Sequence, residues 1–561
     1  MADVALGAGN SSNSGWLRRT STPIALIVAI AIGSLVIFLA NTGSIALVDR
    51  DEGRYAEIGR EMFVSHNYLV PSLLGVPYLE KPPMLYWLLA GSYSVFGLNE
   101  LAARLPIALA ASLGVILVGI FARRVIDPWA GVYSAAILAT TGLYVVLARV
   151  VLTDMLFAVS LSGALMFYFL ADKGLVREYP GFAAFWLGLA VSTLSKGPAA
   201  LLLCCSIILA HHATGRSIQK IRQRALWMCG LLYLAMVLPW FWMIQWQYPS
   251  FARFYIFDQH LARFGGAEHR EPFYFFVPFL VAGLLPWTPV VIAAVSCWTA
   301  HLKSPTADRE YVRFLILWSL IVFGVFSASG GKLVPYILPM FPAVALLLGG
   351  TVREWLKGGM TRTPAVVGFC TSGLLVCALG VATAVTLEKL HAPGVTWLVL
   401  ATILGAIIMT AGLSGRFGGG WQFGTVALSS ALLYLAAAAA APGIYEAFTA
   451  KSQLVSVRKT LQPDDEIAMT EVYYPSEAFY LGRIPYVVDP NRELGYGLSL
   501  VGGSPRLIPD LSTLKERTRG KELFCLTGVS PKYIQRLEEH FPDLHILSQN
   551  RAATIVMIRN H

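Results

Sequence analysis

The segment 49–55, Asp-Arg-Asp-Glu-Gly-Arg-Tyr, brings carboxylates and guanidinium groups together immediately after a long apolar run. That run, residues 23–40, is about as long as a helix that crosses a lipid bilayer. A carboxylate does nothing to anchor such a helix. Next to cations that hold a phosphate, it can orient a sugar or a nucleophile. The segment therefore predicts chemistry at a membrane surface.

The composition indicates that most of the chain is surrounded by lipid rather than by water. Of 561 residues, 56% are hydrophobic and 14% are charged, and the mean hydropathy is +0.61. Soluble domains have about 25% charged residues, so the composition predicts a polytopic α-helical membrane protein. A formal charge of +10 could indicate nucleic-acid binding, but basic cytoplasmic loops explain it better and no nucleic-acid partner is expected. The seven cysteines show no metal-binding or disulfide spacing.

Apolar stretches and basic clusters together predict the topology. The stretches give about fourteen candidate spans of roughly 20 residues. They lie near 22–40, 83–97, 103–122, 129–147, 151–171, 180–194, 198–213, 225–245, 275–298, 312–328, 333–351, 364–386, 395–414 and 421–441. All basic clusters fall on the cytoplasmic side, as expected, only if residues 83–97 lie along the membrane surface. That segment is short, starts at Pro82-Pro83 and contains several aromatic residues, which is typical of interfacial helices. We therefore predict about thirteen transmembrane helices, with interfacial helices in the first outer loop and the N-terminus inside.

The character of the sequence changes near residue 442. Residues 1–442 are predicted to form the transmembrane catalytic domain, and residues 443–561 a small periplasmic α/β domain. The second part is polar and alternates short strand-like and helix-like runs. The expected strands are 466–469, 486–488, 523–526 and 553–557, and the expected helices lie near 451–461, 510–518 and 530–540.

The predicted topology places many unusual polar residues on the outer side of the membrane. Charged groups at membrane depth are costly and point to function by default. Arg149 and Lys196 could instead be snorkelling anchors and Tyr336 an aromatic-belt residue, but Asp51 and Asp154 have no such role. The candidate substrate-contacting residues are Asp51, Arg54, Tyr55, Tyr78, Lys81, Arg149, Asp154, Lys196, Arg270, Lys332 and Tyr336.

Two histidines in one outer loop raise the question of a metal. His260 and His269 could meet Glu80 across space and form a three-ligand zinc site of nitrogen and oxygen donors. Their spacing of nine residues is not a recognised zinc pattern. The alternative is that both are surface histidines in an aromatic-rich loop.

Several short motifs carry a family resemblance that covers nearly the whole chain. They are Asp51-Glu52-Gly53-Arg54-Tyr55, Tyr78-Leu79-Glu80-Lys81-Pro82-Pro83, Thr153-Asp154, Ser195-Lys196-Gly197 and Gly331-Lys332-Leu333. With them the chain resembles the GT-C glycosyltransferases related to protein O-mannosyltransferases. Within that group it is most similar to the bacterial lipid A aminoarabinose transferases.

The resemblance implies an inverting pentosyltransferase in the bacterial inner membrane, with a periplasmic active site. Its donor would be undecaprenyl phosphate carrying 4-amino-4-deoxy-L-arabinose, its acceptor a lipid A phosphate, and its effect resistance to polymyxin and other cationic peptides. By motif, Asp51 would be the principal catalytic carboxylate and Asp154 the second acid. Lys81, with Arg54 and Tyr55, would hold donor phosphate, and Glu80 would take a metal-binding or structural position.

Alternatives remain open at this level. A protein O-mannosyltransferase-like or other polyprenyl-phosphate-sugar glycosyltransferase would use similar residues, with Asp51 as a base if the acceptor were a hydroxyl. A transporter or flippase for a polyprenyl-linked sugar is disfavoured, since the charges gather at one surface and the sequence shows no internal symmetry. No P-loop is present, so no nucleotide cofactor is expected.

Overall fold

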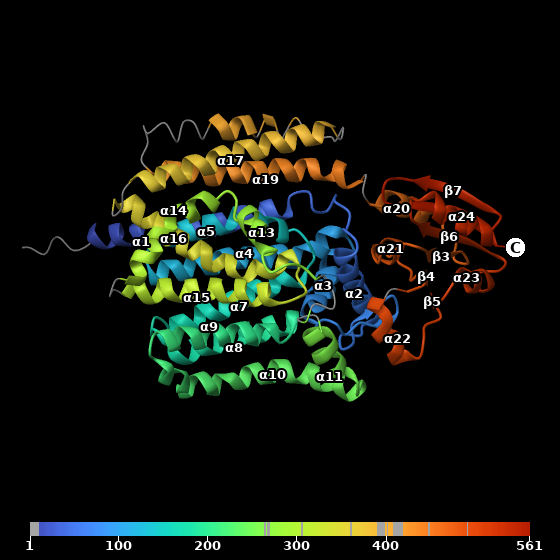
Figure 1. Cartoon of the computed structure of the whole chain (residues 1–561), viewed down its shortest axis with the longest axis horizontal. Coiled ribbons are helices and arrows are strands. Elements are labelled where there is room, and N and C mark those ends of the chain that lie inside the picture. The colour runs from blue at the N-terminus through green and yellow to red at the C-terminus, as the bar shows by residue number, and fades with distance from the viewer. Residues whose placement is uncertain are drawn as a thin grey trace, which may run out of the picture.

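The computed structural model describes residues 11–262, 265, 270–303, 307–358, 362–389, 396, 399–400, 402–407, 419–446, 449–490 and 492–560. Long helices run side by side through most of the molecule, and a six-stranded sheet with its own helices lies at one end (Figure 1). We call that end part, from α20 to β8 (451–560), the C-terminal unit.

The helical part is built from the following elements in chain order: α1 (Ser11–Leu39), α2 (Asp51–Ser65), β1 (Ser72–Leu73), β2 (Val76–Pro77), α3 (Met84–Phe96), α4 (Glu100–Val125), α5 (Pro128–Ala139), α6 (Gly142–Leu147), α7 (Thr153–Asp172), α8 (Glu178–Lys196), α9 (Ala199–Thr214), η1 (Ile218–Arg222), α10 (Arg224–Gln247), α11 (Phe251–Arg253), η2 (Phe254–Leu261), α13 (Phe276–Gly283), α14 (Thr288–Lys303), α15 (Ala307–Ala328), η3 (Val334–Met340), α16 (Phe341–Lys357), α17 (Arg362–Lys389) and α19 (Gly419–Glu446).

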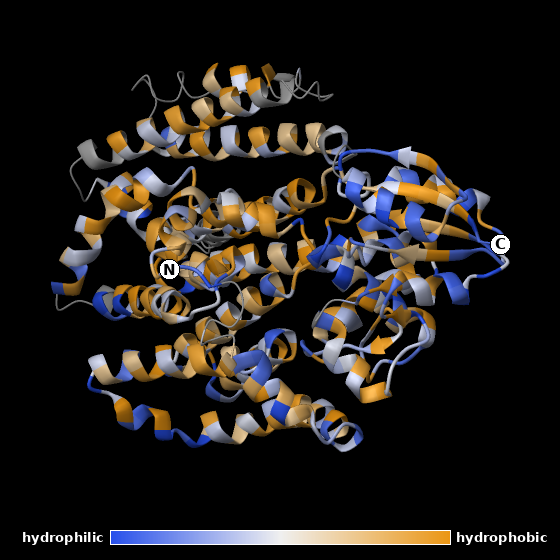
Figure 2. Ribbon diagram, turned by 45° about the vertical axis from the view of Figure 1, so that its right-hand side comes forward, coloured by the Kyte–Doolittle hydropathy of each residue, from blue (hydrophilic) through white to orange (hydrophobic). Residues whose placement is uncertain are grey.

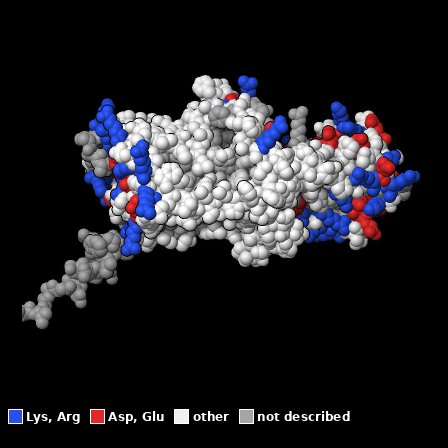
Figure 3. Space-filling view, turned by 90° about the horizontal axis from the view of Figure 1, so that it is seen from below, with Lys and Arg blue, Asp and Glu red and all other residues white. Residues whose placement is uncertain are grey.

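The surface of the helical part is that of a membrane protein. Figure 3 shows a broad middle zone almost free of charged side chains, between a lysine- and arginine-rich end and the C-terminal unit. Colouring by hydropathy shows the same contrast between the bundle and the more polar C-terminal unit (Figure 2). Large apolar side chains face outward in this zone, such as Trp242 on α10, which is 71% exposed. Lipid is the solvent that makes such exposure favourable.

The structure agrees with the predicted spans only in part. Among the described residues, seven helices are long and apolar enough to cross a membrane, or eight if α13 and α14, bent by 101°, count as one span. The predicted span 129–147 is two helices, α5 and α6, and the predicted span 395–414 falls largely outside the described residues. A multi-pass helical membrane protein is confirmed, whereas the number thirteen is not.

The basic clusters that were predicted to share one side do lie together. Asp127 after α4 forms ion pairs with Arg353 (2.6 Å) and Lys357 (2.7 Å) on α16. Lys173 after α7 pairs with Glu310 of α15 at 2.7 Å. These contacts join loops at the end of the bundle that lies opposite the C-terminal unit. Basic loops therefore gather at this end of the bundle, while the side of the membrane that they face stays a prediction.

The first outer loop folds at the other end, beside the C-terminal unit. It contains α2, the short β1–β2 hairpin and α3, and α3 corresponds to the segment 83–97 that was predicted to lie along the surface. Leu85, Leu89 and Tyr93 of α3 are buried, and α3 packs against α2. The Ala56 carbonyl of α2 accepts a 3.3 Å hydrogen bond from the Tyr93 hydroxyl. This pairing fixes α2 at the end of the bundle that faces the C-terminal unit.

The C-terminal unit is an α/β sheet with strand order β5-β4-β3-β6-β8-β7. Strands β5, β4, β3 and β6 are parallel, and β8 runs antiparallel to both β6 and β7. The expected strands and helices are all present, while α21, α22, β5 and β7 were not anticipated. The elements are α20 (Lys451–Thr460), β3 (Glu466–Met469), α21 (Ser476–Leu481), β4 (Tyr486–Val488), η4 (Arg492–Leu494), α22 (Gly495–Val501), β5 (Leu507–Ile508), α23 (Leu511–Arg517), β6 (Lys521–Thr527), α24 (Pro531–His540), β7 (Leu544–Gln549) and β8 (Thr554–Asn560).

The sheet presents the carboxyl ends of two central strands to the bundle. The segments that follow β3 and β4 carry Ser476 and Glu493, and both residues contact the first outer loop. The buried apolar core is also continuous across this junction, where the rings of Phe479 and Tyr93 lie 6.0 Å apart. The carboxyl edge of a parallel sheet is where α/β folds build their sites.

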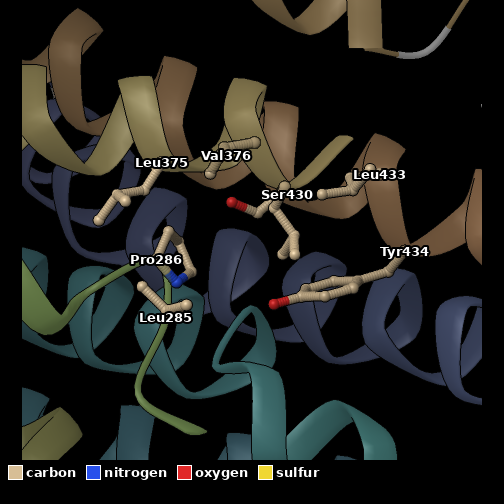
Figure 4. A pocket seen from close by; sticks show the side chains of 8 residues that line it. Leu285, Pro286, Leu375, Val376, Ser430, Leu433 and Tyr434 are labelled. Carbon is tan, nitrogen blue, oxygen red and sulfur yellow. The ribbon is translucent and has the colours of Figure 1, made fainter. Parts of the chain in front are cut away.

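An apolar crevice lies where the bend between α13 and α14 meets α17 and α19, which are at the edge of the bundle (Figure 1 and Figure 4). Its two polar side chains are already engaged, since Ser430 donates to Val426 O at 2.7 Å and Tyr434 to Thr140 O at 3.1 Å. The crevice therefore offers only apolar surface, which suits hydrocarbon chains.

A close approach between α16 and α5 generates a stability prediction. A Cβ added at Gly349 of α16 would lie 2.7 Å from the backbone nitrogen of Ser134 on α5, whereas one at Gly324 of α15 would meet nothing within 4 Å. We expect Gly349→Ala to lower the free energy of unfolding by about 1–3 kcal/mol through overpacking, and Gly324→Ala to leave it unchanged or slightly raised. Denaturation in detergent micelles measures both, and equal stabilities would contradict the packing described.

Candidate functional site

Asp51 is the first residue of α2, and its carboxylate lies at the positive end of the helix dipole. The side chain is 60% exposed and forms an ion pair with Arg54, one helical turn further on. An exposed carboxylate in this position is available to a ligand. It needs no structural rearrangement to reach one.

Arg54 is the centre of a first polar group. Its guanidinium pairs with Glu493 of the C-terminal unit and lies 4.9 Å from the centre of the Tyr55 ring and 6.0 Å from that of Tyr78. The Tyr78 hydroxyl hydrogen-bonds Glu80 Oε2 at 3.1 Å and Glu493 Oε1 at 3.3 Å. Acids therefore outnumber the single guanidinium in this group. Lys81, half-buried, directly follows Glu80 in the same segment.

Asp154, Lys196 and Tyr336 form a second polar group. Asp154 lies in the first turn of α7 and pairs with Lys196, the last residue of α8. The Lys196 ammonium is 4.2 Å from the centre of the Tyr336 ring on η3 and 5.5 Å from that of Phe157. Three separate segments of the bundle thus converge on one ammonium group.

Tyr55 is affected by charges of both groups. Burial raises the pKa of the Tyr55 hydroxyl to about 12; Arg54 lowers this pKa, and the charges of Asp51, Asp154 and Glu80 raise it. Both polar groups therefore act on the same hydroxyl. At neutral pH the group stays protonated and can donate a hydrogen bond to an anion.

A buried ion pair between Glu52 and Arg104 sets the position of α2. Glu52 Oε1 accepts hydrogen bonds from Arg104 Nε (2.8 Å) and from the Val151 amide (3.0 Å), and Glu52 Oε2 accepts from the Val48 amide (2.9 Å). Arg104 of α4 donates further to backbone carbonyls of the turn 42–46. One carboxylate therefore connects the segment before α2 with the segment before α7. This fixes the position of Asp51 relative to that of Asp154.

The C-terminal unit also contacts the start of α2 through Asp49. Asp49 accepts hydrogen bonds from the amide of Ser476 (3.1 Å) and from its hydroxyl. Burial raises the pKa of Asp49 to about 7, and the hydrogen bonds from Ser476 lower it only in part. Gly53 faces the same serine, since an added Cβ there would lie 2.9 Å from the Ser476 Cβ.

Three predicted substrate-binding residues lie outside these two groups. Lys332 is buried and donates to the backbone carbonyls of Glu271 (2.7 Å) and Ser329. Arg270 is exposed and forms an isolated β-bridge with Gly331. Arg149 donates to backbone carbonyls at the end of α1. The contacts of Lys332 and Arg149 hold the backbone in place.

The predicted metal ligands give no complete site among the described residues. His260 contacts the Tyr255 carbonyl at 2.6 Å through Nδ1, and its Nε2 would lie 3.0 Å from a Cβ at Gly197. His269 lies outside the described residues. Within the described part of the chain, no three His, Cys, Asp or Glu side chains are arranged to hold a metal ion. A zinc ion at Glu80, His260 and His269 stays a prediction.

Sequence reasoning missed the roles of Glu52, Arg104, Ser476 and Glu493. Glu52 stood next to Asp51 and was noted only as part of the acidic segment. Arg104, near the start of an apolar helix, was a charge at membrane depth that could have been singled out. Ser476 and Glu493 carry no local signal, because both reach the first outer loop only through the docking of the C-terminal unit.

Comparisons with known proteins give one family model over part of the chain and relatives of another name over about two thirds of it. The family model "Dolichyl-phosphate-mannose-protein mannosyltransferase" matches residues 80–243. An undecaprenyl phosphate-alpha-4-amino-4-deoxy-L-arabinose arabinosyl transferase of Pseudomonas aeruginosa is 30% identical over 379 residues, covering 66% of this chain and 67% of that protein. A second such transferase, from Pseudomonas fluorescens, is 30% identical over 388 residues, and there the match spans 68% of this chain and 63% of the relative's length.

A solved structure has the same fold over nearly the whole chain. The crystal structure of ArnT from Cupriavidus metallidurans bound to undecaprenyl phosphate superimposes with a TM-score of 0.82 at 22% identity. The match covers 97% of this chain and 98% of that one.

The Glu52–Arg104 pair generates a stability prediction. Arg104→Leu leaves a buried carboxylate without its partner, which typically costs about 3–5 kcal/mol. The matched control is Arg559→Leu, which removes an exposed pair with Glu522 and is expected to cost less than about 1 kcal/mol. Unfolding in detergent micelles compares the two, and equal losses would show that the buried pair is not a structural constraint.

The Asp49 carboxyl generates a pH prediction. Because the pKa of Asp49 is about 7 in the folded state and 3.8 ordinarily, the folded state holds a proton that the unfolded state releases between these values. Its contribution to stability is therefore present in acid and is lost as pH rises toward 7, at a slope below about 1.4 kcal/mol per pH unit since Asp49 is only half-buried.

We expect Asp49→Asn to flatten the dependence of unfolding temperature on pH between 5 and 7. Asp464→Asn, an exposed carboxylate in the same molecule, serves as the control. An unchanged slope in Asp49→Asn would contradict the assignment.

Proposed function

This chain belongs to the family of undecaprenyl phosphate-α-4-amino-4-deoxy-L-arabinose arabinosyl transferases, and on that premise we propose that it transfers this aminosugar from undecaprenyl phosphate to a phosphate of lipid A. The observation that carries the proposal is a pair of cations that are each held by a carboxylate, Arg54 by Asp51 and Lys196 by Asp154. Both of these carboxylates act on the pKa of Tyr55. Such a site combines cations for a phosphate with acids for an aminosugar.

The cations suit the leaving group. In the reaction, the bond between the anomeric carbon and the donor phosphate oxygen breaks, and undecaprenyl phosphate leaves with the electron pair. Negative charge grows on that phosphate in the transition state, where preorganised cations and hydroxyls stabilise it most. Arg54, Lys196 and the protonated Tyr55 hydroxyl are the groups we assign to this role, with Lys81 from the adjoining segment.

The carboxylates suit the sugar. An aminosugar carries an ammonium group at neutral pH, and the exposed Asp51 is free to bind it or to orient the nucleophile. The nucleophile is an oxygen of the acceptor phosphate, which is already an anion, so no proton has to be removed. Attack opposite to the leaving phosphate inverts the anomeric centre. Asp51 therefore acts by position rather than as a strong base.

The membrane topology belongs to the same proposal. We infer about thirteen spans, with the basic end of the bundle in the cytoplasm, because lysine and arginine gather in short cytoplasmic loops. The two polar groups and the C-terminal unit then face the periplasm from the inner membrane. Both lipid substrates are available there. Capping lipid A phosphates with a cationic sugar would lower the negative charge of the cell surface and so give resistance to polymyxin.

A second candidate follows from the family model match over residues 80–243. A mannosyltransferase acting on a protein hydroxyl would need Asp51 as a general base with a suitable pKa. The arabinosyl transferase is favoured because relatives of that name match over more of the chain.

The test is mass spectrometry of lipid A from cells that lack their own transferase and express this chain. We expect a mass increase of one aminopentose with the wild-type chain and a loss of about 10²-fold or more in Asp51→Asn, since a group acting at the reacting centre is removed. Asp464→Asn is the control and should modify lipid A normally. Modification by Asp51→Asn at the wild-type level would overturn the assignment, and a mannosylated protein instead of modified lipid A would favour the second candidate.

A further inference from the structure

A polar recess lies at the end of α1, separate from the polar groups around Arg54 and Lys196. It holds about 490 Å³ of empty space. Of the residues predicted to bind substrate, only Arg149 lines it. The lining residues are Thr42, Ile45, Val48, Glu52, Arg104, Val146, Arg149, Val150 and Tyr445.

The recess carries one uncompensated positive charge. Arg104 is neutralised by Glu52, with which it forms a 2.6 Å ion pair. Among the residues that the structure describes, no carboxylate pairs with Arg149, which is half-buried. Its guanidinium donates to the carbonyls of Ile37, Phe38 and Ala40, which accounts for three hydrogen bonds. A guanidinium has five N–H donors, so donors remain for an anion.

Burial and the neighbouring Arg104 both lower the pKa of Arg149, to about 10. The guanidinium is still charged at neutral pH, but burial and Arg104 disfavour its charged form. A bound anion would stabilise that form. The Tyr445 phenol is half-buried in the same recess and can donate a further hydrogen bond.

The recess opens toward the apolar surface of the bundle. Val146, at its rim, is 55% exposed. On α1, Ile32 and Val36 are one turn apart, 60% and 59% exposed, and lead toward the helix end that Arg149 caps. The side chain of Asn41 donates to Ala438 O of α19 at 3.1 Å, and Tyr445 of the same helix lines the recess. A molecule that enters here would have its polar end at Arg149 and an apolar chain along α1.

We propose that this recess binds the phosphate headgroup of an anionic lipid, with the hydrocarbon chain lying along the exposed face of α1. The positive charge of Arg149 selects the anion, the Tyr445 hydroxyl donates to it, and the opening to the lipid-facing surface selects a lipid over a free ion. This binding site is separate from the proposed transfer of the aminosugar. It would hold even if the substrates of that reaction were different.

The experiment measures lipid retention by native mass spectrometry of the purified full-length protein, with phosphatidylglycerol and phosphatidylcholine added in equal amounts. We expect the wild-type protein to retain phosphatidylglycerol preferentially. Arg149→Met should weaken that retention about fivefold to tenfold, the effect of one basic residue on an anionic lipid. Arg149→Lys keeps the charge and should retain the lipid within about threefold of wild type on the same grounds.

Two controls make the outcome decisive. Arg149→Met and Arg149→Lys both remove hydrogen bonds to the end of α1, so similar unfolding temperatures with different lipid retention separate binding from folding. Arg124→Gln, at the basic end of the bundle, should leave retention at the wild-type level. Equal retention by wild type and Arg149→Met would overturn the proposal, as would displacement of the lipid by millimolar inorganic phosphate, which would identify a free anion as the ligand.

Discussion

The Glu52–Arg104 ion pair is the interaction on which the arrangement of the site depends. It is buried at the mouth of the bundle, where a charge without its partner would be strongly unfavourable. Because Glu52 also binds the amides of Val48 and Val151, two chain segments about 100 residues apart are held by one carboxylate. The residue before Glu52 is Asp51, and Asp154 follows three positions after Val151. The distance between the two acids is thus set by a structural neighbour rather than by contact with each other.

The C-terminal unit completes this arrangement from the opposite side. Glu493 reaches Arg54 and Tyr78, and Ser476 binds Asp49 next to the start of α2. Both residues follow the carboxyl ends of parallel strands, which is the edge where α/β sheets usually bind ligands. Here that edge binds the membrane part of the same chain. The unit therefore covers one side of the polar group around Arg54, to which η4 contributes Glu493.

Local patterns predicted much of this molecule, while long-range contacts did not follow from them. The apolar runs identified a helical membrane protein, the basic clusters identified its basic end, and alternation in residues 443–561 indicated the sheet. Asp51, Arg54, Asp154 and Lys196 were singled out because each is a charge beside an apolar helix, and the structure brings them into ion pairs. Glu493 was not, since only tertiary docking brings it near Arg54. The break within 129–147 was also missed, because composition does not distinguish one span from two short helices.

The contact between Tyr78 and Glu493 joins residues that are 415 positions apart in the chain. During synthesis, the first outer loop reaches its side of the membrane long before the sheet that supplies Glu493 has been translated. Bringing such distant segments together is a late and slow event in folding. The polar group around Arg54 is therefore incomplete throughout membrane insertion, and it is completed only after the last helices have been inserted and the end of the chain has folded. A chain interrupted before that point would contain Asp51 and Lys196 but would lack the contacts of Glu493 with Arg54 and Tyr78. The complete arrangement therefore forms only once the whole polypeptide has been made.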